Sequence, residues 1–195
     1  MPWYRSKRVV ITVSILMGGL LILYGGAVSR DYNYTDMLDT IADGESSDNY
    51  NAYYGRPGNS SIDFTSMTIA EVLQWQEDYV EEGSPSSAVG RYQFIRPTLQ
   101  GLIDEHNVDT DLPFTAEVQD KLAIELIKRR GVYDFMDGKI SREDFAHNLS
   151  QEWAALPSVK GDNPEESYYA DDGLNEARLD IAEIYHSMET LDNTE

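Results

Sequence analysis

A run of 20 residues without a charged side chain, residues 9–28, divides the chain into two unequal parts. An apolar helix of about 20 residues is long enough to cross the hydrocarbon core of a bilayer. Three basic residues come directly before the run, and positive charges of this kind mark the cytoplasmic side of a membrane helix. We therefore expect residues 1–29 to form a cytoplasmic N-terminus and a transmembrane signal-anchor. Residues 30–195 would form one globular domain outside the cytoplasm.

Two other interpretations of this run stay open. Gly25, Gly26 and Ala27 could serve as a loose cleavage site, as in a secretory signal peptide that is removed. Several glycines, with Thr12 and Ser14, also weaken the hydrophobicity of the run, which would suit an anchor that later leaves the membrane. We favour a retained anchor because the run is longer than the apolar core of most signal peptides. This interpretation predicts a single-pass protein of the inner (cytoplasmic) membrane or of a virion membrane.

The whole chain is strongly acidic. It has 35 acidic and 15 basic residues, a formal net charge of −20, and no acidic residue precedes position 31. Such a surface repels nucleic acid and anionic lipid headgroups, so we expect no nucleic-acid partner. The sequence has no cysteine, and its three histidines are widely spread. We therefore predict neither a metal site nor a cofactor.

Most of the acidic part shows helix signals. Apolar residues recur at helical spacing in six segments, and several segments begin at a capping residue or a proline. The run Ala88–Phe94 is instead typical of a short strand. The expected fold is α+β and predominantly α, with one small β-region. The predicted helices cover about residues 34–43, 69–82, 97–105, 115–130, 141–156 and 174–188, and the last of them would turn Leu174 and Ile184 inward.

The stretch Asp43–Tyr50 contains the best candidate for a catalytic role. Gly44 fits the position just after a helix C-terminus, so Glu45 would lie beside the negative end of the helix dipole. That field, together with partial burial, raises the pKa of a carboxyl group. A raised pKa is what a general acid requires near neutral pH. We therefore predict that Glu45 is a catalytic acid, although a glutamate in such a loop is more often simply solvated.

Four segments, taken in order, carry a resemblance to a known family. They are Glu45-Ser46, Gly90-Arg91-Tyr92-Gln93, Phe114 to Gly131, and Gln151 to Pro157. Together they resemble the lysozyme superfamily and, within it, the lambdoid phage endolysins of glycoside hydrolase family 104. The resemblance covers about residues 36–160 and implies a lysozyme-like catalytic domain. One departure is Ser46, which is similar to soluble lytic transglycosylases, whereas the endolysins have glycine there.

The resemblance also implies a substrate and a reaction. The substrate would be peptidoglycan, cleaved at the β-1,4 bond between N-acetylmuramic acid and N-acetylglucosamine. A lytic transglycosylase of this kind uses one glutamate, here Glu45, first as acid and then as base. The muramic acid's own 6-hydroxyl or N-acetyl group takes part, and the product has a 1,6-anhydro end. Hydrolysis by a muramidase, or a non-catalytic glycan-binding module, are the alternatives. A phage lysis enzyme, a virion entry enzyme and a wall-remodelling enzyme of a secretion apparatus all fit.

The same resemblance implies the substrate contacts. Ser46, Arg91, Tyr92 and Gln93 would bind sugar hydroxyls or N-acetyl groups. If the segment that contains the last three is a strand, alternation places Arg91 and Gln93 on one face and Tyr92 on the other.

Most glycosidases use a second carboxylate. Asp48 and Asp63 are candidates only because they lie near Glu45 in sequence.

Overall fold

The structure is a computed structural model that describes residues 32–191. Within these residues the chain forms α-helices, two short 3-10 helices and isolated β-bridges. These residues contain no β-strand of more than a single bridge. The predominantly α prediction is therefore confirmed, while the small β-region is reduced to single bridges. In chain order the elements are α1 (Thr35–Ser46), η1 (Phe64–Ser66), α2 (Ile69–Glu81), α3 (Arg96–His106), α4 (Ala116–Arg129), α5 (Val132–Met136), α6 (Arg142–Ser150), η2 (Ala170–Asp172) and α7 (Ile181–Glu189).

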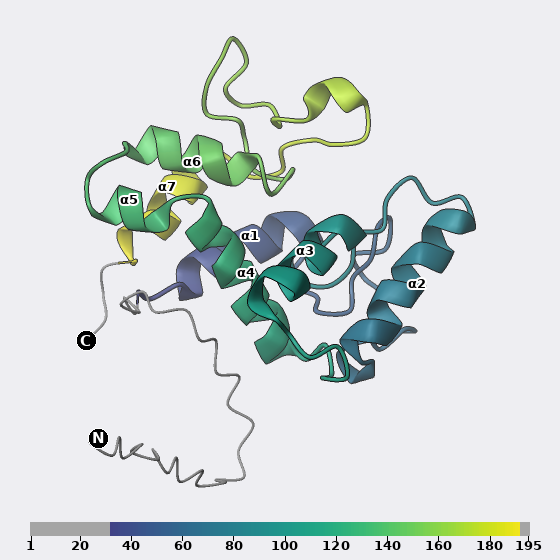
Figure 1. Ribbon diagram of the computed structural model, residues 1–195. Coiled ribbons are helices and arrows are strands. Elements are labelled where there is room, and N and C mark those ends of the chain that lie inside the picture. Colours follow the sequence, from purple (N-terminus) through teal and green to yellow (C-terminus); the bar gives the residue numbers. More distant parts are fainter. Residues whose placement is uncertain (1–31, 192–195) are drawn as a thin grey trace, which may run out of the picture.

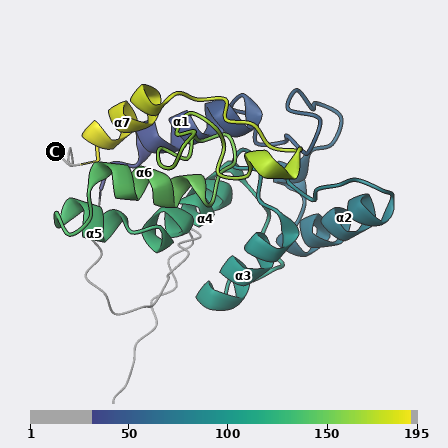
Figure 2. The ribbon, with the colours of Figure 1, turned by 90° about the horizontal axis from the view of Figure 1, so that it is seen from above.

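The helices form two groups (Figure 1). In the first group α1 packs against α4 and α7, α5 contacts α4 and α6, and α6 contacts α7. In the second group α2 packs against α3. Figure 2 shows the two groups side by side, with α2 and α3 projecting from the rest of the molecule. One cluster of buried apolar side chains runs through both groups, so they share a core.

Local capping explains where several helices begin. The Thr68 side chain accepts a hydrogen bond from the N–H of Glu71, whose own side chain bonds back, and this box begins α2 as predicted. Thr115 caps α4 by accepting from the N–H of Val118. Ser141 begins α6 in the same way. These helices could be located from sequence because each signal acts within one helical turn.

Two predicted helices are shorter in the structure. α6 ends at Ser150, so Trp153 lies after the helix, where its side chain is buried in the core. α7 begins at Ile181, where the Asp180 side chain caps the helix. Leu174 was predicted to face inward, but it is 54% exposed. The residues before α7 cross α1 as an irregular segment, because the N–H groups of Arg178 and Leu179 bond to another part of the chain.

The predicted strand Ala88–Phe94 is a tight turn. Val89 and Phe94 exchange two backbone hydrogen bonds, of 3.1 and 2.9 Å, and the residues between them reverse the chain. Gly90 (φ 79°) and Gln93 (φ 48°) both have left-handed backbone conformations. The alternation of faces expected for a strand therefore does not apply here.

The predicted membrane localisation is corrected by the structure. Residues 9–28, on which it rested, lie outside the described residues. Among residues 32–191 no helix is both long and apolar enough to cross a bilayer. The longest helix in this part is α4, with 14 residues, and a span needs about 20. We therefore propose neither the single-pass localisation nor a membrane partner.

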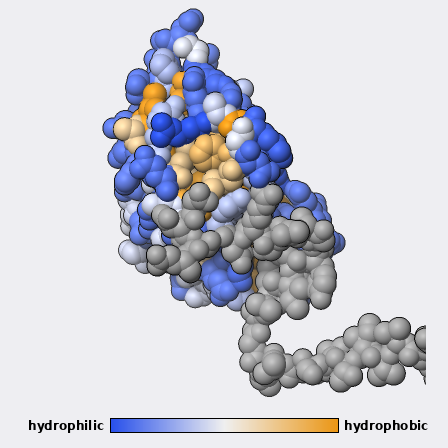
Figure 3. Space-filling view, turned by 90° about the vertical axis from the view of Figure 1, so that its left-hand side faces the viewer, coloured by the Kyte–Doolittle hydropathy of each residue, from blue (hydrophilic) through white to orange (hydrophobic). Residues whose placement is uncertain are grey.

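Figure 3 shows one face of the molecule, on the side where α5 and α7 lie in Figure 1. Apolar side chains gather near its centre and hydrophilic ones surround them. Phe135 and Met136 of α5, and Ile181 and Tyr185 of α7, are half-buried and pack against the core. None of these four residues lines the cleft described next.

Candidate active site

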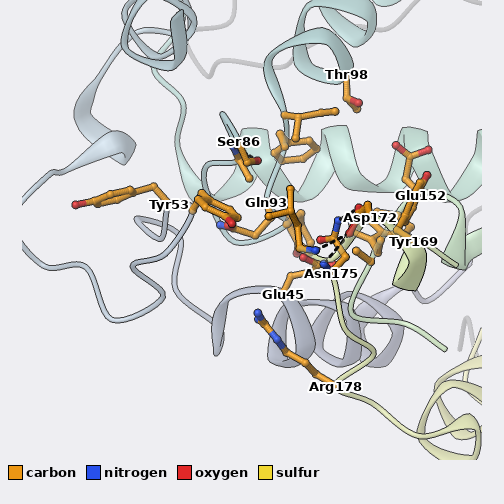
Figure 4. Close-up of a pocket in the computed structure, with 18 of the residues that line it drawn as sticks. Glu45, Tyr53, Ser86, Gln93, Thr98, Glu152, Tyr169, Asp172, Asn175 and Arg178 are labelled. Carbon is orange, nitrogen blue, oxygen red and sulfur yellow. Dashed lines mark hydrogen bonds between the residues drawn. The ribbon is translucent and has the colours of Figure 1, made fainter. Parts of the chain in front are cut away.

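A cleft with a volume of about 730 Å³ lies between the two groups of helices. Its walls come from the loop after α1, the turn before α3, and the long segment between α6 and α7 (Figure 4). Glu45 is one of the residues that line this cleft. The side chains labelled in Figure 4 are Glu45, Tyr53, Ser86, Gln93, Thr98, Glu152, Tyr169, Asp172, Asn175 and Arg178.

Glu45 lies inside the last turn of α1 and not beyond its end. The helix continues to Ser46, and Ser47 (φ 54°) is its left-handed C-cap. The sequence suggested that the helix ends before Gly44, but Gly44 lies within α1. It is required for close packing instead, because a Cβ atom there would lie 2.9 Å from Leu179 Cδ1 and 3.0 Å from Ala155 Cβ.

The environment of Glu45 favours its protonated form. Burial raises the pKa of this carboxyl group to about 7, while the Ala155 N–H and the charge of Arg178 act in the opposite direction. The Ala155 N–H donates a 2.9 Å hydrogen bond to Glu45 Oε1. The raised pKa agrees with the sequence prediction, but its main cause is burial and not the helix dipole. At neutral pH such a group can both give and take a proton.

Tyr92 and Gln93 line the cleft together with Glu45. The Tyr92 ring is almost fully buried, and its hydroxyl donates a 2.6 Å hydrogen bond to Asp120. Gln93 is half-buried, and its Nε2 donates to the Gly90 carbonyl over 2.8 Å. Its side-chain oxygen has no hydrogen bond among the described residues. The two positions remain predicted substrate contacts.

Ser46 and Arg91 do not line the cleft. Ser46 is fully buried, and its hydroxyl donates a 2.8 Å hydrogen bond to the Arg91 carbonyl. The Arg91 guanidinium, with a side chain only 7% exposed, bonds to Asp39 at 2.5 Å and, through Nε, to Asp48 at 2.6 Å. Their roles as substrate ligands remain predictions from the resemblance, while their contacts join α1 to the turn that bears Tyr92.

Sequence analysis missed two residues of α4 that support this turn. Gln119 is fully buried; its Oε1 accepts from the Arg91 N–H over 2.9 Å, and its Nε2 donates to the Tyr50 carbonyl over 3.1 Å. The next residue, Asp120, accepts hydrogen bonds from the hydroxyls of Tyr50 and Tyr92. The available signal was an amide side chain within the apolar stripe of a helix.

The other carboxylates near the site are already engaged. Glu152 lines the cleft and forms an ion pair with Arg130 at 2.7 Å. Asp172 also lines the cleft, but its oxygens accept from the backbone of Leu174 and Asn175 and from the Asn175 side chain, which lowers its pKa.

Asp48 and Asp63 do not line the cleft. Asp48 pairs with Arg91, and Asp63 accepts from the hydroxyls of Thr65 and Ser66. Neither lies where a second catalytic carboxylate is needed.

The tyrosines of the loop after α1 divide between two roles. The Tyr53 ring packs 5.2 Å from Trp75 and 5.4 Å from Tyr79, and it also lines the cleft. Tyr54 lines the cleft as well, whereas Tyr50 points to Asp120 outside it. The cleft therefore offers aromatic surface of the kind that stacks on sugar rings.

One family model, described as Endolysin, matches residues 35–172. The match begins at α1 and ends at η2, so it includes Glu45 and the turn that bears Tyr92 and Gln93. The segment Gly173–Leu179, which contributes Leu174, Asn175 and Arg178 to the cleft, lies beyond it. No curated protein and no solved structure matches the chain.

Proposed function

Because the chain belongs to the Endolysin family, phage enzymes that degrade the bacterial cell wall, we propose that it is a lytic transglycosylase with Glu45 as its single catalytic residue. Peptidoglycan is then the substrate, and the bond cleaved is the β-1,4 linkage between N-acetylmuramic acid and N-acetylglucosamine. A lysozyme-like fold for residues 30–195 is part of this proposal.

One observation carries the choice of reaction. Glu45 lines the cleft, and burial raises its pKa to about 7. The two other carboxylates that line the cleft, Glu152 and Asp172, are held by an ion pair and by backbone hydrogen bonds. A glycosidase that uses two carboxylates needs both to face the scissile bond. A single acid–base group instead favours a mechanism in which the substrate supplies the nucleophile.

The proposed reaction balances with Glu45 alone. Protonated Glu45 donates its proton to the glycosidic oxygen, and the bond between this oxygen and C1 of the muramic acid breaks. The resulting carboxylate accepts a hydrogen bond from the Ala155 N–H and lies near the positive charge of Arg178. It then takes the proton of the muramic acid's 6-hydroxyl as this oxygen bonds to C1. The products are an N-acetylglucosamine end and a 1,6-anhydro end, and Glu45 is protonated again.

Tyr92 and Gln93 support binding in this proposal. Gln93 presents its amide in the cleft close to the turn of Gly90, where it can accept from a sugar hydroxyl or N-acetyl N–H. The ring of Tyr92 forms part of the wall. Ser46 and Arg91 act indirectly, by fixing the turn against α1.

Mass spectrometry of the products tests the reaction directly. Purified peptidoglycan is digested with the protein and the released muropeptides are weighed. Transglycosylation predicts fragments one water lighter than those from a muramidase. Fragments with ordinary reducing ends would show hydrolysis, and cleaved peptide cross-links with uncut glycan strands would show that the protein is not a glycosidase. Asp172→Asn, altered in the same cleft, serves as the matched control and should retain the product pattern.

A further inference from the structure

We propose that Arg178 is a positioning residue, which keeps Glu45 oriented and favours its carboxylate form during the second half of the reaction. This inference rests on the proposed function of Glu45 and extends it to a residue outside the family match. Arg178 belongs to the irregular segment Gly173–Leu179, which precedes α7 and lines the cleft. Figure 4 shows its side chain beneath Glu45, on the α1 side of the site.

The first support is a set of backbone contacts that meet at Glu45. Arg178 N–H and Leu179 N–H both donate to the Ala155 carbonyl, at 2.8 and 3.2 Å. The N–H of the same residue, Ala155, donates to Glu45 Oε1 at 2.9 Å. The segment that contains Arg178 therefore fixes Ala155, and Ala155 in turn bonds to the carboxyl group of Glu45.

The second support is a direct side-chain contact with α1. Arg178 Nη1 donates to the carbonyl of Gly44 over 3.2 Å, one residue before Glu45. The absent side chain at position 44 also lets the neighbouring residue pack closely, since a Cβ atom there would meet Leu179 at 2.9 Å. Three segments that are distant in sequence thus pack around one glycine, and Arg178 bonds to two of them.

The third support is the charge itself. The other charged side chains that line the cleft are Arg130, Glu152 and Asp172. Arg130 and Glu152 neutralise each other, and Asp172 bonds within its own loop. Arg178 forms no ion pair with a carboxylate of residues 32–191, and its charge is the one that acts on Glu45.

The charge has a defined consequence for an acid that later becomes a base. Burial favours the protonated form of Glu45. Burial alone would therefore disfavour the Glu45 carboxylate that forms when the glycosidic bond breaks. A nearby positive charge lowers the free energy of that carboxylate. Removing the charge should therefore raise the pKa of Glu45, so that the acid form persists to higher pH.

The test compares pH–rate profiles of the full chain with peptidoglycan as substrate. The activity of an enzyme that needs protonated Glu45 falls as the pH rises through the pKa of that group. In Arg178→Met this alkaline limb should move up by about half a pH unit or more, as expected for the loss of a nearby, partly screened charge. Arg178→Lys keeps the charge and should keep the limb near its wild-type position. High salt should reduce the difference in pH between the alkaline limbs of Arg178→Met and the wild type.

Arg129→Met is the matched control, because Arg129 pairs with Glu105 at the surface and does not line the cleft. The alkaline limb of the pH–rate profile of Arg129→Met should stay at its wild-type position. Thermal unfolding of each variant shows whether it is folded, and Arg178→Gln provides a second neutral side chain if Met is poorly folded. An unmoved limb in both neutral variants, or an equal shift in Arg178→Lys, overturns the role of Arg178. Loss of the proposed function would appear separately, as activity retained by Glu45→Gln.

Discussion

The N–H of Ala155 bonds to Oε1 of Glu45 across 110 residues of sequence, at a distance of 2.9 Å. This bond joins the last turn of α1 to the turn after α6. Both residues belong to the part of the chain that the family model matches. A side chain that burial would leave mostly protonated is thereby given a donor for its ionised form, and both protonation states become available near pH 7.

Replacing Glu45 with Gln should abolish activity without unfolding the protein. An amide of the same shape cannot donate or accept the transferred proton, and general acid–base catalysis contributes roughly 10²–10⁴-fold. We expect the rate of muropeptide release to fall by at least roughly 10²-fold. The circular dichroism spectrum should stay that of the wild type. A Gln variant that degrades peptidoglycan at the normal rate would show that Glu45 is not the catalytic acid.

The raised pKa of Glu45 should also appear in the pH dependence of stability. The carboxyl group has a pKa of about 7 in the folded protein and near 4.5 when unfolded. Between these values the unfolded state releases the proton first, so the protein loses stability as the pH rises from about 4.5 to 7. The loss is at most about 3 kcal/mol, and partial exposure of the side chain reduces it.

Comparison with Glu45→Gln isolates this effect from the other titrating groups. Urea unfolding at pH 5 and at pH 8 gives the change in free energy of unfolding for each protein. The wild type should lose more stability over this range than the variant. Equal losses would mean that the carboxyl group titrates normally.

Two helical glycines should respond to alanine in opposite directions. Gly44→Ala places a methyl group 2.9 Å from Leu179 and 3.0 Å from Ala155, so the segment before α7 must shift. We expect a loss of roughly 1–3 kcal/mol in the free energy of unfolding, together with lower activity. Gly101→Ala in α3 meets no atom within 4 Å and should gain up to about 1 kcal/mol. Urea unfolding of the two variants checks both signs, and a stabilised Gly44→Ala would contradict the close packing.

Ser46→Ala should act on stability more than on catalysis. The buried hydroxyl donates to the Arg91 carbonyl and accepts from the Asn49 N–H. Its removal leaves buried polar groups without a partner, which costs about 1–3 kcal/mol. The reaction rate per folded molecule should stay within about twofold of the wild type, since Ser46 does not line the cleft. A large increase in KM with unchanged stability would instead support the direct substrate contact predicted from sequence.

Gly90 and Gln119 were not recognised as partners from the sequence. A Cβ atom at position 90 would lie 2.3 Å from Gln119 Oε1, and the left-handed φ of 79° adds strain. Their contact brings α4 against the turn that bears Tyr92 and Gln93. Nothing in the spacing of the two residues along the chain points to this pairing.

The sequence by itself determined most helix starts, the predominantly helical class and Glu45 as the candidate acid. Those features depend on capping, periodicity and a local motif, which act over a few residues. The tertiary structure decided that Ala88–Phe94 is a turn and that the chain before α7 is irregular. It also decided that Ser46 and Arg91 do not line the cleft, and that burial is the main cause of the raised pKa of Glu45. These outcomes depend on contacts between distant segments, above all those of Ala155, Arg178 and Gln119, which local patterns do not encode.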